Sequence, residues 1–458
     1  ALLAAAAGRG ARGEVAWFAS WQHASHVRAL GPTARELRAR GWSVALVIHE
    51  EARGYAPADV EVLSAGPLPW TWEEELEFRD ILFAAPSAPS ANSTPEEAHA
   101  ASVRRAEASE AYFLGSQRSL ARGLQAALDA GAARPDLLVA DVSSPGALDF
   151  AELHGIRPAV FSGWPVGATL QAIGDRSALR HPWLPSELFV FTQSAHQQGL
   201  YDRLLRAAVT SAVPWVLEFS GFHAPRRRLR EELGLPPGGL ELMQPPPRAG
   251  EPRPLVVVAT HWALDRPRPL PPSVVLVGPT EDYAARAAAR PALPAGLRQW
   301  LADDGAPLVY VSLGTNVQPK GAQISAMAEG MRELWGAARF LWDTRAEMSG
   351  ALAEVGLPPN VRAEEWVDQL AVLASGRVSA FVTHCGLNSL HEAMHFGVPV
   401  IGLPYVADQL VSARLLVEAG VGVRIDTRRV TGQSFAAAVR EVLDTPGYRE
   451  ASRRAGAL

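Results

Sequence analysis

The feature that most constrains the fold is a short apolar segment that runs directly into a turn and a helix in the C-terminal half of the chain. Residues 379–383 (SAFVT) are mostly apolar or β-branched and predict a buried strand. The turn at 384–386 (HCG) follows, and residues 387–395 predict a helix that stops at Gly397. A strand–turn–helix unit presents unpaired backbone N–H groups and the positive end of the helix at one point. It therefore offers a site for an anionic group such as a diphosphate.

Polar side chains accompany this unit. Ser389 and Glu392 are three residues apart and share one face of the predicted helix. A second predicted strand, 398–403, ends at Pro404. The polar residues near the helix start and after the second strand are Asn388, Ser389, Glu392, Asp408 and Gln409. Taken singly, each has an ordinary explanation, such as a helix N-cap for Asp408 or a solvated helix residue for Glu392.

The stretch from Trp366 to Gln409 closely resembles the nucleotide-sugar box of the UDP-glycosyltransferases, glycosyltransferase family 1. The matching positions are Trp366, Gln369, the run 383–389 (THCGLNS), Glu392, the run 397–399 (GVP), Pro404, Asp408 and Gln409. So many positions at fixed spacing make a specific signal. Two positions depart from the plant pattern. Leu387 stands where a Trp is usual, which weakens any inference about the sugar, and Asp368 replaces a common Pro.

The resemblance implies a role for each residue of the box. Trp366 stacks on uracil, while Gln369 and Glu392 hold the ribose. The diphosphate is held by His384, Asn388 and Ser389, with Gly386 in the same turn, and the sugar hydroxyls bond to Asp408 and Gln409. A small hydroxyl-and-glycine loop, 312–316 (SLGTN), follows another predicted strand and offers further donors to phosphates. It matches the Ser/Thr-Gly loop of the family, which implies diphosphate contacts from Thr315 and Ser312; a plain turn is the alternative.

The first part of the chain predicts a βαβ unit. Strands at 14–19 and 43–48 flank a helix at 27–40, which favours a parallel sheet. His26 lies where the loop enters the helix, and residues 26–42 resemble the first helix of the same family. That resemblance implies that His26 is the catalytic base. His23 is a rival only by its proximity.

A second strand of this half ends in an acid. Residues 135–141 (PDLLVAD) match a motif of the family whose last Asp supports the catalytic histidine, which implies that role for Asp141. A turn or a helix cap is the alternative for an Asp after a strand. Residues 255–260 are the last strand that the sequence predicts in this half. Family members line the acceptor pocket with irregular segments like 64–115 and 163–230, whose aromatics include Trp70, Trp72, Phe78, Phe83, Trp164, Trp183, Trp215 and Phe222.

The predicted fold class is α/β, with two doubly wound Rossmann-like domains that face a cleft, the GT-B architecture. The N-terminal acceptor-binding domain is expected at 14–279 and the C-terminal UDP-sugar-binding domain at 295–458. The Ala-, Arg- and Pro-rich segment 280–294 is expected to link them. Ligands of open α/β sheets bind outside the carboxyl ends of the strands. The residues predicted at such ends are His26, Asp141, Thr315 and His384.

The function expected from the resemblance is an inverting, metal-independent UDP-glycosyltransferase that moves a hexose, glucose first, to a hydroxyl of a small lipophilic acceptor. The UDP-sugar is then a co-substrate, and no cofactor is expected. The chain has no Asp-x-Asp motif and no His/Cys cluster with metal-ligand spacing. Three alternatives stay open: a UDP-glucuronosyltransferase, which Leu387 and animal-like segments leave in competition, a UDP-sugar 2-epimerase, and a non-catalytic nucleotide-sugar-binding protein.

Composition bounds the partners and the compartment. A net charge of −5 gives no basic footprint, so nucleic acid is an unexpected partner. The single cysteine, Cys385, excludes an intrachain disulfide framework and favours the cytosol. Residues 1–7 (ALLAAAA) fit the remnant of a signal peptide or a disordered leader, so a secretory lumen or membrane attachment stays open if the termini are truncated. Residues 8–13 match GxGxxG but precede a strand, which argues against a dinucleotide site.

Overall fold

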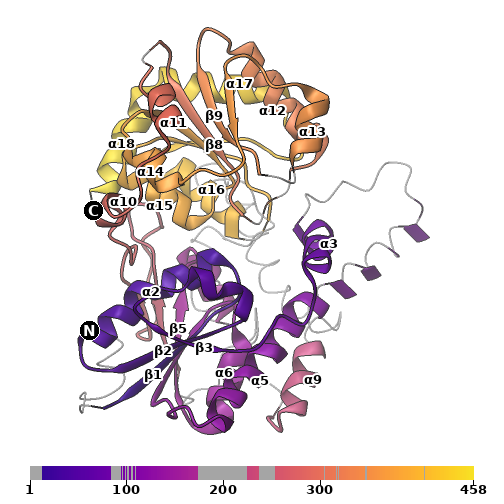
Figure 1. Ribbon diagram of the computed structural model, residues 1–458, viewed down its shortest axis with the longest axis vertical. Helices are drawn as coiled ribbons and strands as arrows, with labels where there is room; N and C mark the ends of the chain where they lie inside the picture. Colours follow the sequence, from indigo (N-terminus) through magenta and orange to yellow (C-terminus); the bar gives the residue numbers. More distant parts are fainter. Residues whose placement is uncertain are drawn as a thin grey trace.

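The structure is a computed structural model in which the chain forms two α/β domains, one above the other in Figure 1. It describes residues 13–83, 94, 96–97, 100, 103–104, 107–108, 110–173, 224–236 and 253–457, apart from 304, 316, 318, 346, 347 and 407. Outside the described residues lie the leader at 1–7, all but the last residue of the Gly-rich run at 8–13, and three of the aromatics that the sequence placed near the acceptor: Trp183, Trp215 and Phe222.

The N-terminal domain is built on a seven-stranded parallel sheet of order β3-β2-β1-β4-β5-β6-β7. The strands are β1 (Val15–Ala19), β2 (Ser43–Ile48), β3 (Glu61–Ser64), β4 (Leu137–Asp141), β5 (Arg157–Ser162), β6 (Leu255–Val258) and β7 (Val274–Leu276). The central strands are apolar runs because helices cover both faces of the sheet. The strand order reverses between β1 and β4, and this pair is therefore the topological switch point at which ligands of such sheets bind.

Helices cover the two faces of this sheet, and the strand residues alternate between them. Phe18 of β1 packs on the side of α2, whereas Trp17 packs on the side of α5 and α6. The helical segments of the domain are α2 (Ala24–Ala39), the 3₁₀-helix η1 (Glu50–Tyr55), α3 (Trp72–Phe83), the π-helical turn η2 (Glu110–Leu114), α5 (Gly115–Asp129), α6 (Pro145–His154), α7 (Val166–Ala172) and α9 (Ala224–Glu232).

The C-terminal domain holds a six-stranded parallel sheet of order β10-β9-β8-β11-β12-β13, with its switch point between β8 and β11. Its strands are β8 (Leu308–Ser312), β9 (Arg339–Asp343), β10 (Val361–Glu364), β11 (Val378–Thr383), β12 (Val400–Gly402) and β13 (Gly422–Arg424). Its helices are α11 (Ala295–Leu301), α12 (Gly321–Glu333), α13 (Ser349–Val355), α14 (Gln369–Ala374), α15 (Leu387–His395), α16 (Asp408–Glu418), α17 (Gly432–Asp444) and α18 (Pro446–Gly456). One core lies under α15 and α16 and another under α12 and α17.

The predicted fold class is confirmed, but the edge strands were not predicted. β7 follows β6 in the N-terminal sheet, so the expectation that residues 255–260 are the last strand of this half was wrong. The strands β3, β10 and β13 were also missed. These edge strands have only three or four residues and are incompletely buried. They lack the long apolar run by which a central strand is recognised.

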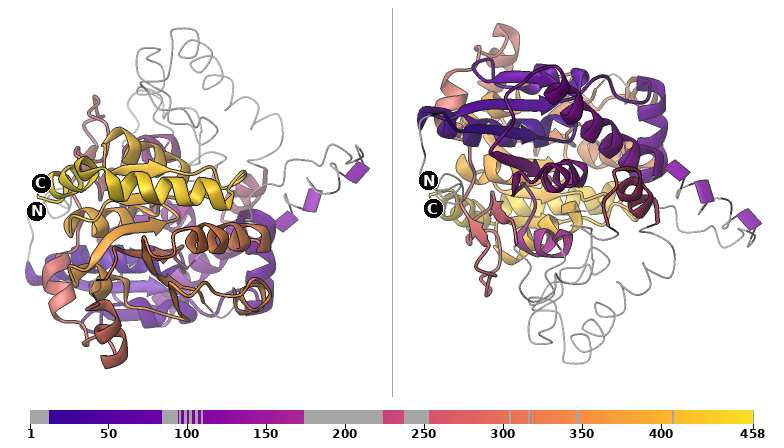
Figure 2. Two further views of the ribbon diagram at one scale, coloured as in Figure 1. Left: turned by 90° about the horizontal axis from the view of Figure 1, so that it is seen from above. Right: turned by 90° about the horizontal axis from the view of Figure 1, so that it is seen from below.

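Two segments join the domains. The helix α10 (Tyr283–Ala288) lies at the level between the two sheets in Figure 1, and just before it Thr280 Oγ1 donates to the carbonyl of Ala29 in α2 (3.1 Å). The second segment, residues 261–266, lies between β6 and β7. Its Leu264 is buried in the C-terminal core, and its Arg266 forms an ion pair with Glu418 of α16. The views from above and below show the two domains stacked on one another (Figure 2).

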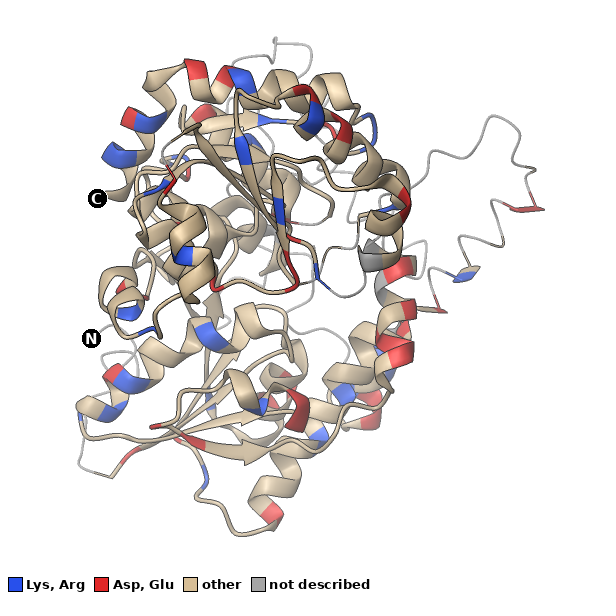
Figure 3. Cartoon of the chain, turned by 45° about the horizontal axis from the view of Figure 1, so that its top comes forward, with Lys and Arg blue, Asp and Glu red and all other residues tan. Residues whose placement is uncertain are grey.

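Charge and apolar character are distributed as in an ordinary globular surface. Acidic and basic residues are interspersed along the helices of both domains in the part of the chain that is described (Figure 3). Among these residues, we find no helix that is both long enough and apolar enough to cross a membrane.

Candidate active site

His26 and Asp141 form a close pair at the N-terminal switch point. His26 follows β1 in the first turn of α2, and Asp141 ends the adjacent strand β4. His26 Nδ1 lies 2.9 Å from Asp141 Oδ1, and the same oxygen accepts the backbone N–H of Ser143 at 2.8 Å. The His26 side chain is 15% exposed and the Asp141 side chain 2%. Because Nδ1 is bonded to the acid, Nε2 is the nitrogen that could take a proton from a bound hydroxyl.

The electrostatic surroundings favour a basic imidazole. Burial by itself lowers the pKa of His26, but the charge and hydrogen bond of Asp141 and the more distant charge of Asp408 outweigh it, so the pKa is raised. Asp408 is the first residue of α16 in the other domain, and burial raises its own pKa to about 6. The mutual influence of the two groups brings the predicted sugar-binding acid near the predicted base.

His23 has a different environment. Its ring is buried, at 4% exposure, and its Nε2 lies 2.7 Å from the hydroxyl of Tyr112. Of the two neighbouring histidines, His26 is therefore the one that an acid orients and that keeps an exposed edge. This observation separates the candidates that the sequence left side by side.

The predicted diphosphate loops meet at the second switch point. β8 and β11 are adjacent, with Ser312 in register with Thr383, so the loops that follow them leave the sheet side by side. The imidazole of His384 lies between two glycines: a Cβ on Gly314 would come within 2.5 Å of its Cε1, and one on Gly386 within 2.6 Å of its Nε2. Gly314 also has a φ of +71°, which favours glycine. Burial, aided by the charge of Arg345, lowers the pKa of His384 to about 4, so this histidine is neutral at neutral pH.

The helix start beside His384 is free to receive an anion. The N-cap residue of α15 is Gly386, which has no side chain to cap the first turn. Ser312 is differently placed, because its hydroxyl donates to Asp343 Oδ2 at 3.1 Å. Asp343 ends β9, and burial raises its pKa to about 6. The Ser312 hydroxyl is thus oriented by a carboxylate that the sequence did not single out.

The predicted ribose residues form a hydrogen-bonded group. Gln369 Nε2 in α14 donates to Glu392 Oε2 at 2.6 Å and to Ser389 Oγ at 3.2 Å. Burial raises the pKa of Glu392, although Gln369 and Arg286 oppose it. Trp366, the predicted uracil platform, is 74% exposed and thus open to a stacking partner.

The remaining residues of the box connect to the rest of the fold. Asp368, the departure from the family pattern, is the N-cap of α14 and accepts the N–H of Ala371. Gln409 Oε1 accepts the backbone N–H of Tyr405 at 2.9 Å, so its amide oxygen supports the preceding loop. Asn388 Nδ2 donates to the carbonyl of Ser25 at 3.3 Å, across the domain interface and next to His26.

Sequence reasoning missed the residues that support this site. Arg345 Nη1 donates to the carbonyl of Gly314 at 2.9 Å and has a φ of +53°, and Arg286 of the linker lies 3.9 Å from Glu392. Arg345 follows a predicted strand, which is the signal that could have found it. Arg286 gave no such signal, because its contact depends on how the linker folds.

Replacing Gly314 by Ala should weaken UDP binding. A Cβ there must displace the His384 ring and also occupy a left-handed conformation, a strain of about 1–3 kcal/mol, which corresponds to a loss of affinity of roughly fivefold or more. Calorimetric titration with UDP checks this. Gly336→Ala is the matched control, because Gly336 has a φ of +84° but a Cβ there meets nothing within 4 Å. Equal UDP affinities for the two variants would contradict the role given to this contact.

Comparisons with known proteins agree with this arrangement. The family model described as UDP-glucoronosyl and UDP-glucosyl transferase matches residues 253–457. An ecdysteroid UDP-glucosyltransferase of Lymantria dispar multicapsid nuclear polyhedrosis virus is 32% identical over 43% of this chain and 38% of its own length. A UDP-glycosyltransferase of Talaromyces amestolkiae is 25% identical over 70% of this chain and 61% of its own. The chain thus spans about two to three fifths of the length of these relatives.

The fold has counterparts among solved structures. Os79 from O. sativa, crystallised in complex with UDP, superimposes with a TM-score of 0.62 at 20% sequence identity, over 96% of this chain and 94% of that one. At this identity the likeness concerns the fold. Together with the sequence matches, it shows that this chain belongs to the UDP-glycosyltransferase family.

Proposed function

We propose that this protein is an inverting UDP-glycosyltransferase that transfers a hexose, most readily glucose, to a hydroxyl of a small lipophilic acceptor. The observation that carries the proposal is the His26–Asp141 pair, with Nδ1 and Oδ1 2.9 Å apart, close to Asp408 of the facing domain. A buried acid that orients a histidine is the arrangement by which proteins make a general base.

In the proposed reaction, Nε2 of His26 takes the proton of the acceptor hydroxyl. The acceptor oxygen forms a bond to the anomeric carbon of the sugar from the side opposite UDP. The bond between that carbon and the phosphate oxygen breaks, and UDP leaves with the electron pair. Asp141 stabilises the imidazolium that results. The product sugar therefore has the inverted anomeric configuration.

Charge grows on the diphosphate as UDP leaves. We propose that it is met by the backbone N–H groups at the start of α15 and by the polar side chains of the adjoining loops, Thr315, His384, Asn388 and Ser389. Gln369 and Glu392 would take the ribose hydroxyls, and Trp366 the uracil face. Asp408 and the amide nitrogen of Gln409 would bond the sugar. The proposal needs no metal ion, since these donors take the part that a cation would otherwise play.

The test is UDP release, measured with EDTA present, from UDP-glucose and from UDP-glucuronic acid, each with and without a pool of phenolic, sterol and terpenoid alcohols. We expect release that depends on the pool, is faster with UDP-glucose and persists in EDTA. A faster reaction with UDP-glucuronic acid would reassign the donor, and loss of activity in EDTA would reject metal independence. Conversion of the UDP-sugar to its C2 epimer without acceptor, or UDP binding without any turnover, would reject the transferase.

A further inference from the structure

A chain of buried hydrogen bonds runs beside the His26–Asp141 pair. Trp70 Nε1 donates to Glu75 Oε2 at 2.6 Å, and the hydroxyl of Tyr112 donates to Glu75 Oε1 at 3.0 Å. The same hydroxyl lies 2.7 Å from His23 Nε2. The side chains of the last three groups are almost fully enclosed: Glu75 is 3% exposed, Tyr112 0% and His23 4%. They come from α3, η2 and the loop before α2, which are far apart in sequence.

The direction of these bonds follows from the donors available. A carboxylate can only accept, so Glu75 takes one hydrogen from the Trp70 indole and one from the Tyr112 hydroxyl. The single hydrogen of the tyrosine is then used, and its oxygen must accept from His23, which therefore presents Nε2–H. The buried carboxylate thus fixes the rotamer and the protonated nitrogen of His23 through one tyrosine.

His23 is also tied to His26 through the backbone. It is the N-cap residue of α2, and its carbonyl accepts the N–H of His26 at 3.0 Å and that of Val27 at 3.1 Å. The indole of Trp21 packs edge-on against both rings, with centroids 4.4 Å from His23 and 5.4 Å from His26. A shift of His23 would consequently move the first turn of α2 and with it the imidazole of His26.

We propose that Tyr112 and Glu75 are positioning residues of the glycosyl-transfer reaction: through His23 they hold the first turn of α2 so that His26 meets Asp141. This inference rests on the proposed function. It assigns a reason to the burial of a glutamate next to the site, where an unpaired charge would be costly. It also separates the two histidines by task, since His23 carries the position and His26 the proton.

The key variant is Tyr112→Phe. It removes the hydroxyl and keeps the ring, which packs against Trp21, Trp70, Phe78 and Phe113. We expect kcat to fall at least about tenfold, because small misplacements of a catalytic group are costly, while KM for the UDP-sugar and the Kd of UDP stay unchanged. Glu75→Leu should behave alike, and Glu75→Gln, which keeps an oxygen that can accept from Tyr112, should recover most of the rate.

The matched control is Tyr448→Phe. The hydroxyl of Tyr448 donates to Glu441 Oε1 at 2.7 Å, so it is also a tyrosine–glutamate pair, but it lies on the exposed side of the C-terminal domain. Its loss should leave kcat unchanged. A tenfold loss in this control, or unchanged kcat in Tyr112→Phe, would overturn the inference, as would an effect of Tyr112→Phe on KM for the donor alone.

A readout that needs no activity makes the inference independent of the reaction. The charged or titratable groups that bear on His26 are Asp141 from β4, Asp408 from α16 and His23 from its own loop. If the network holds His26 on Asp141, Tyr112→Phe should lower the pKa of His26, followed by NMR titration of the labelled histidine. A change in Tm with an unchanged His26 titration would mean a merely structural role. Absence of transfer by the parent protein would reject the proposed function, while the titration would still decide the positioning.

Discussion

Replacing His26 by Ala is expected to lower the turnover of UDP-sugar at least about 10²-fold, the contribution typical of a general base. The variant loses the only group that both faces Asp141 at hydrogen-bond distance and keeps an exposed edge at the switch point, among the residues that the structure describes. UDP binding should be retained, because the predicted nucleotide residues belong to the other domain. Steady-state kinetics and UDP titration measure the two effects separately.

The control for this substitution is His154→Ala. His154 ends α6, and its Nε2 lies 2.8 Å from Gln125 Oε1, so a histidine contact is lost away from the pair. Turnover should stay near the parent value. A His26→Ala protein with nearly normal turnover would remove His26 from the mechanism and with it the central argument for the reaction.

The pH dependence of turnover has a definite sign. A general base acts in its neutral form, and the pKa of His26 is raised by Asp141 and Asp408 in spite of burial. Activity should therefore be present above that raised pKa and be lost as the pH falls through it, at a pH above the ordinary histidine value of about 6.5. Asp141→Asn removes the main charge that raises the pKa, so the acid limb of kcat/KM should move to lower pH. An acid limb that does not move would mean that another group titrates.

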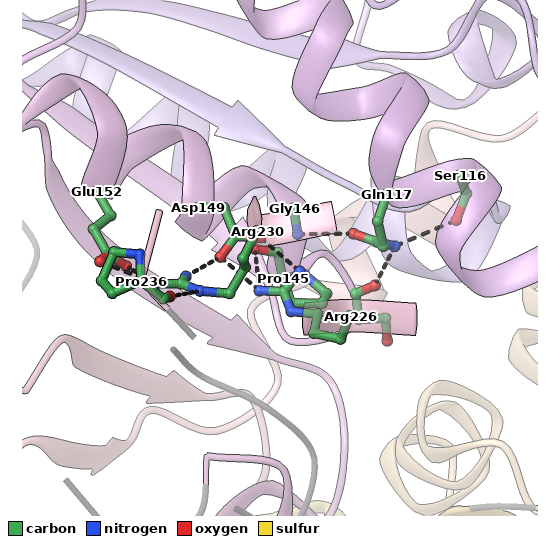
Figure 4. Close-up of polar contacts among 10 residues, drawn as sticks. Ser116, Gln117, Pro145, Gly146, Asp149, Glu152, Arg226, Arg230 and Pro236 are labelled. Carbon is green, nitrogen blue, oxygen red and sulfur yellow. Dashed lines mark hydrogen bonds and ion pairs between the residues drawn. The ribbon is translucent and has the colours of Figure 1, made fainter. Parts of the chain in front are cut away.

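Replacing Asp149 by Ala is expected to destabilise the protein by about 3–5 kcal/mol, the range for breaking a buried ion pair. Asp149 is 1% exposed in α6, and its carboxylate bonds Arg226 Nη2 at 2.7 Å and Arg230 Nη1 at 2.5 Å, both from α9 (Figure 4). Arg230 is itself 2% exposed. Without the carboxylate, two guanidinium groups lose their buried counter-charge. Urea unfolding gives the free energy.

Two comparison proteins sharpen this measurement. Glu333→Gln breaks an exposed pair with Arg440 and should change the free energy of unfolding by less than about 1 kcal/mol. The triple variant Asp149→Leu, Arg226→Met, Arg230→Met should recover most of the loss, because well-packed apolar groups often replace a buried ionic cluster at little cost. An Asp149→Ala protein as stable as the Glu333→Gln variant would mean that the cluster does not hold α9 on α6.

The central part of the fold could be predicted because it depends on local pattern. The apolar runs of β1, β4, β8 and β11 are recognisable in the sequence, and each is followed by a polar residue at its carboxyl end. Adjacent parallel strands deliver those residues to one edge, which is why His26 and Asp141 meet although 115 residues separate them. The edge strands could not be predicted, since three or four half-buried residues carry no distinctive period.

The supporting contacts of the site could not be predicted for a different reason. The packing of His384 between Gly314 and Gly386 depends on two loops that approach only after the sheet has formed. The link from Glu75 to His23 spans separations of 37 and 89 residues through Tyr112, and none of the three residues belongs to a motif. A motif identifies what must touch the substrate, whereas the residues that hold those groups in place are chosen by packing.

Leu264 has a consequence for how the molecule can be divided. It belongs by sequence to the stretch between two strands of the N-terminal sheet, yet its side chain fills the core of the C-terminal domain together with Leu297 and Leu301. A fragment that starts at 295 would leave an apolar hole where Leu264 sits, while one that starts at 253 would carry its own plug. The hydrophobic unit around the nucleotide site therefore begins before the covalent linker, and the two halves of the molecule share one piece of chain as a common wall.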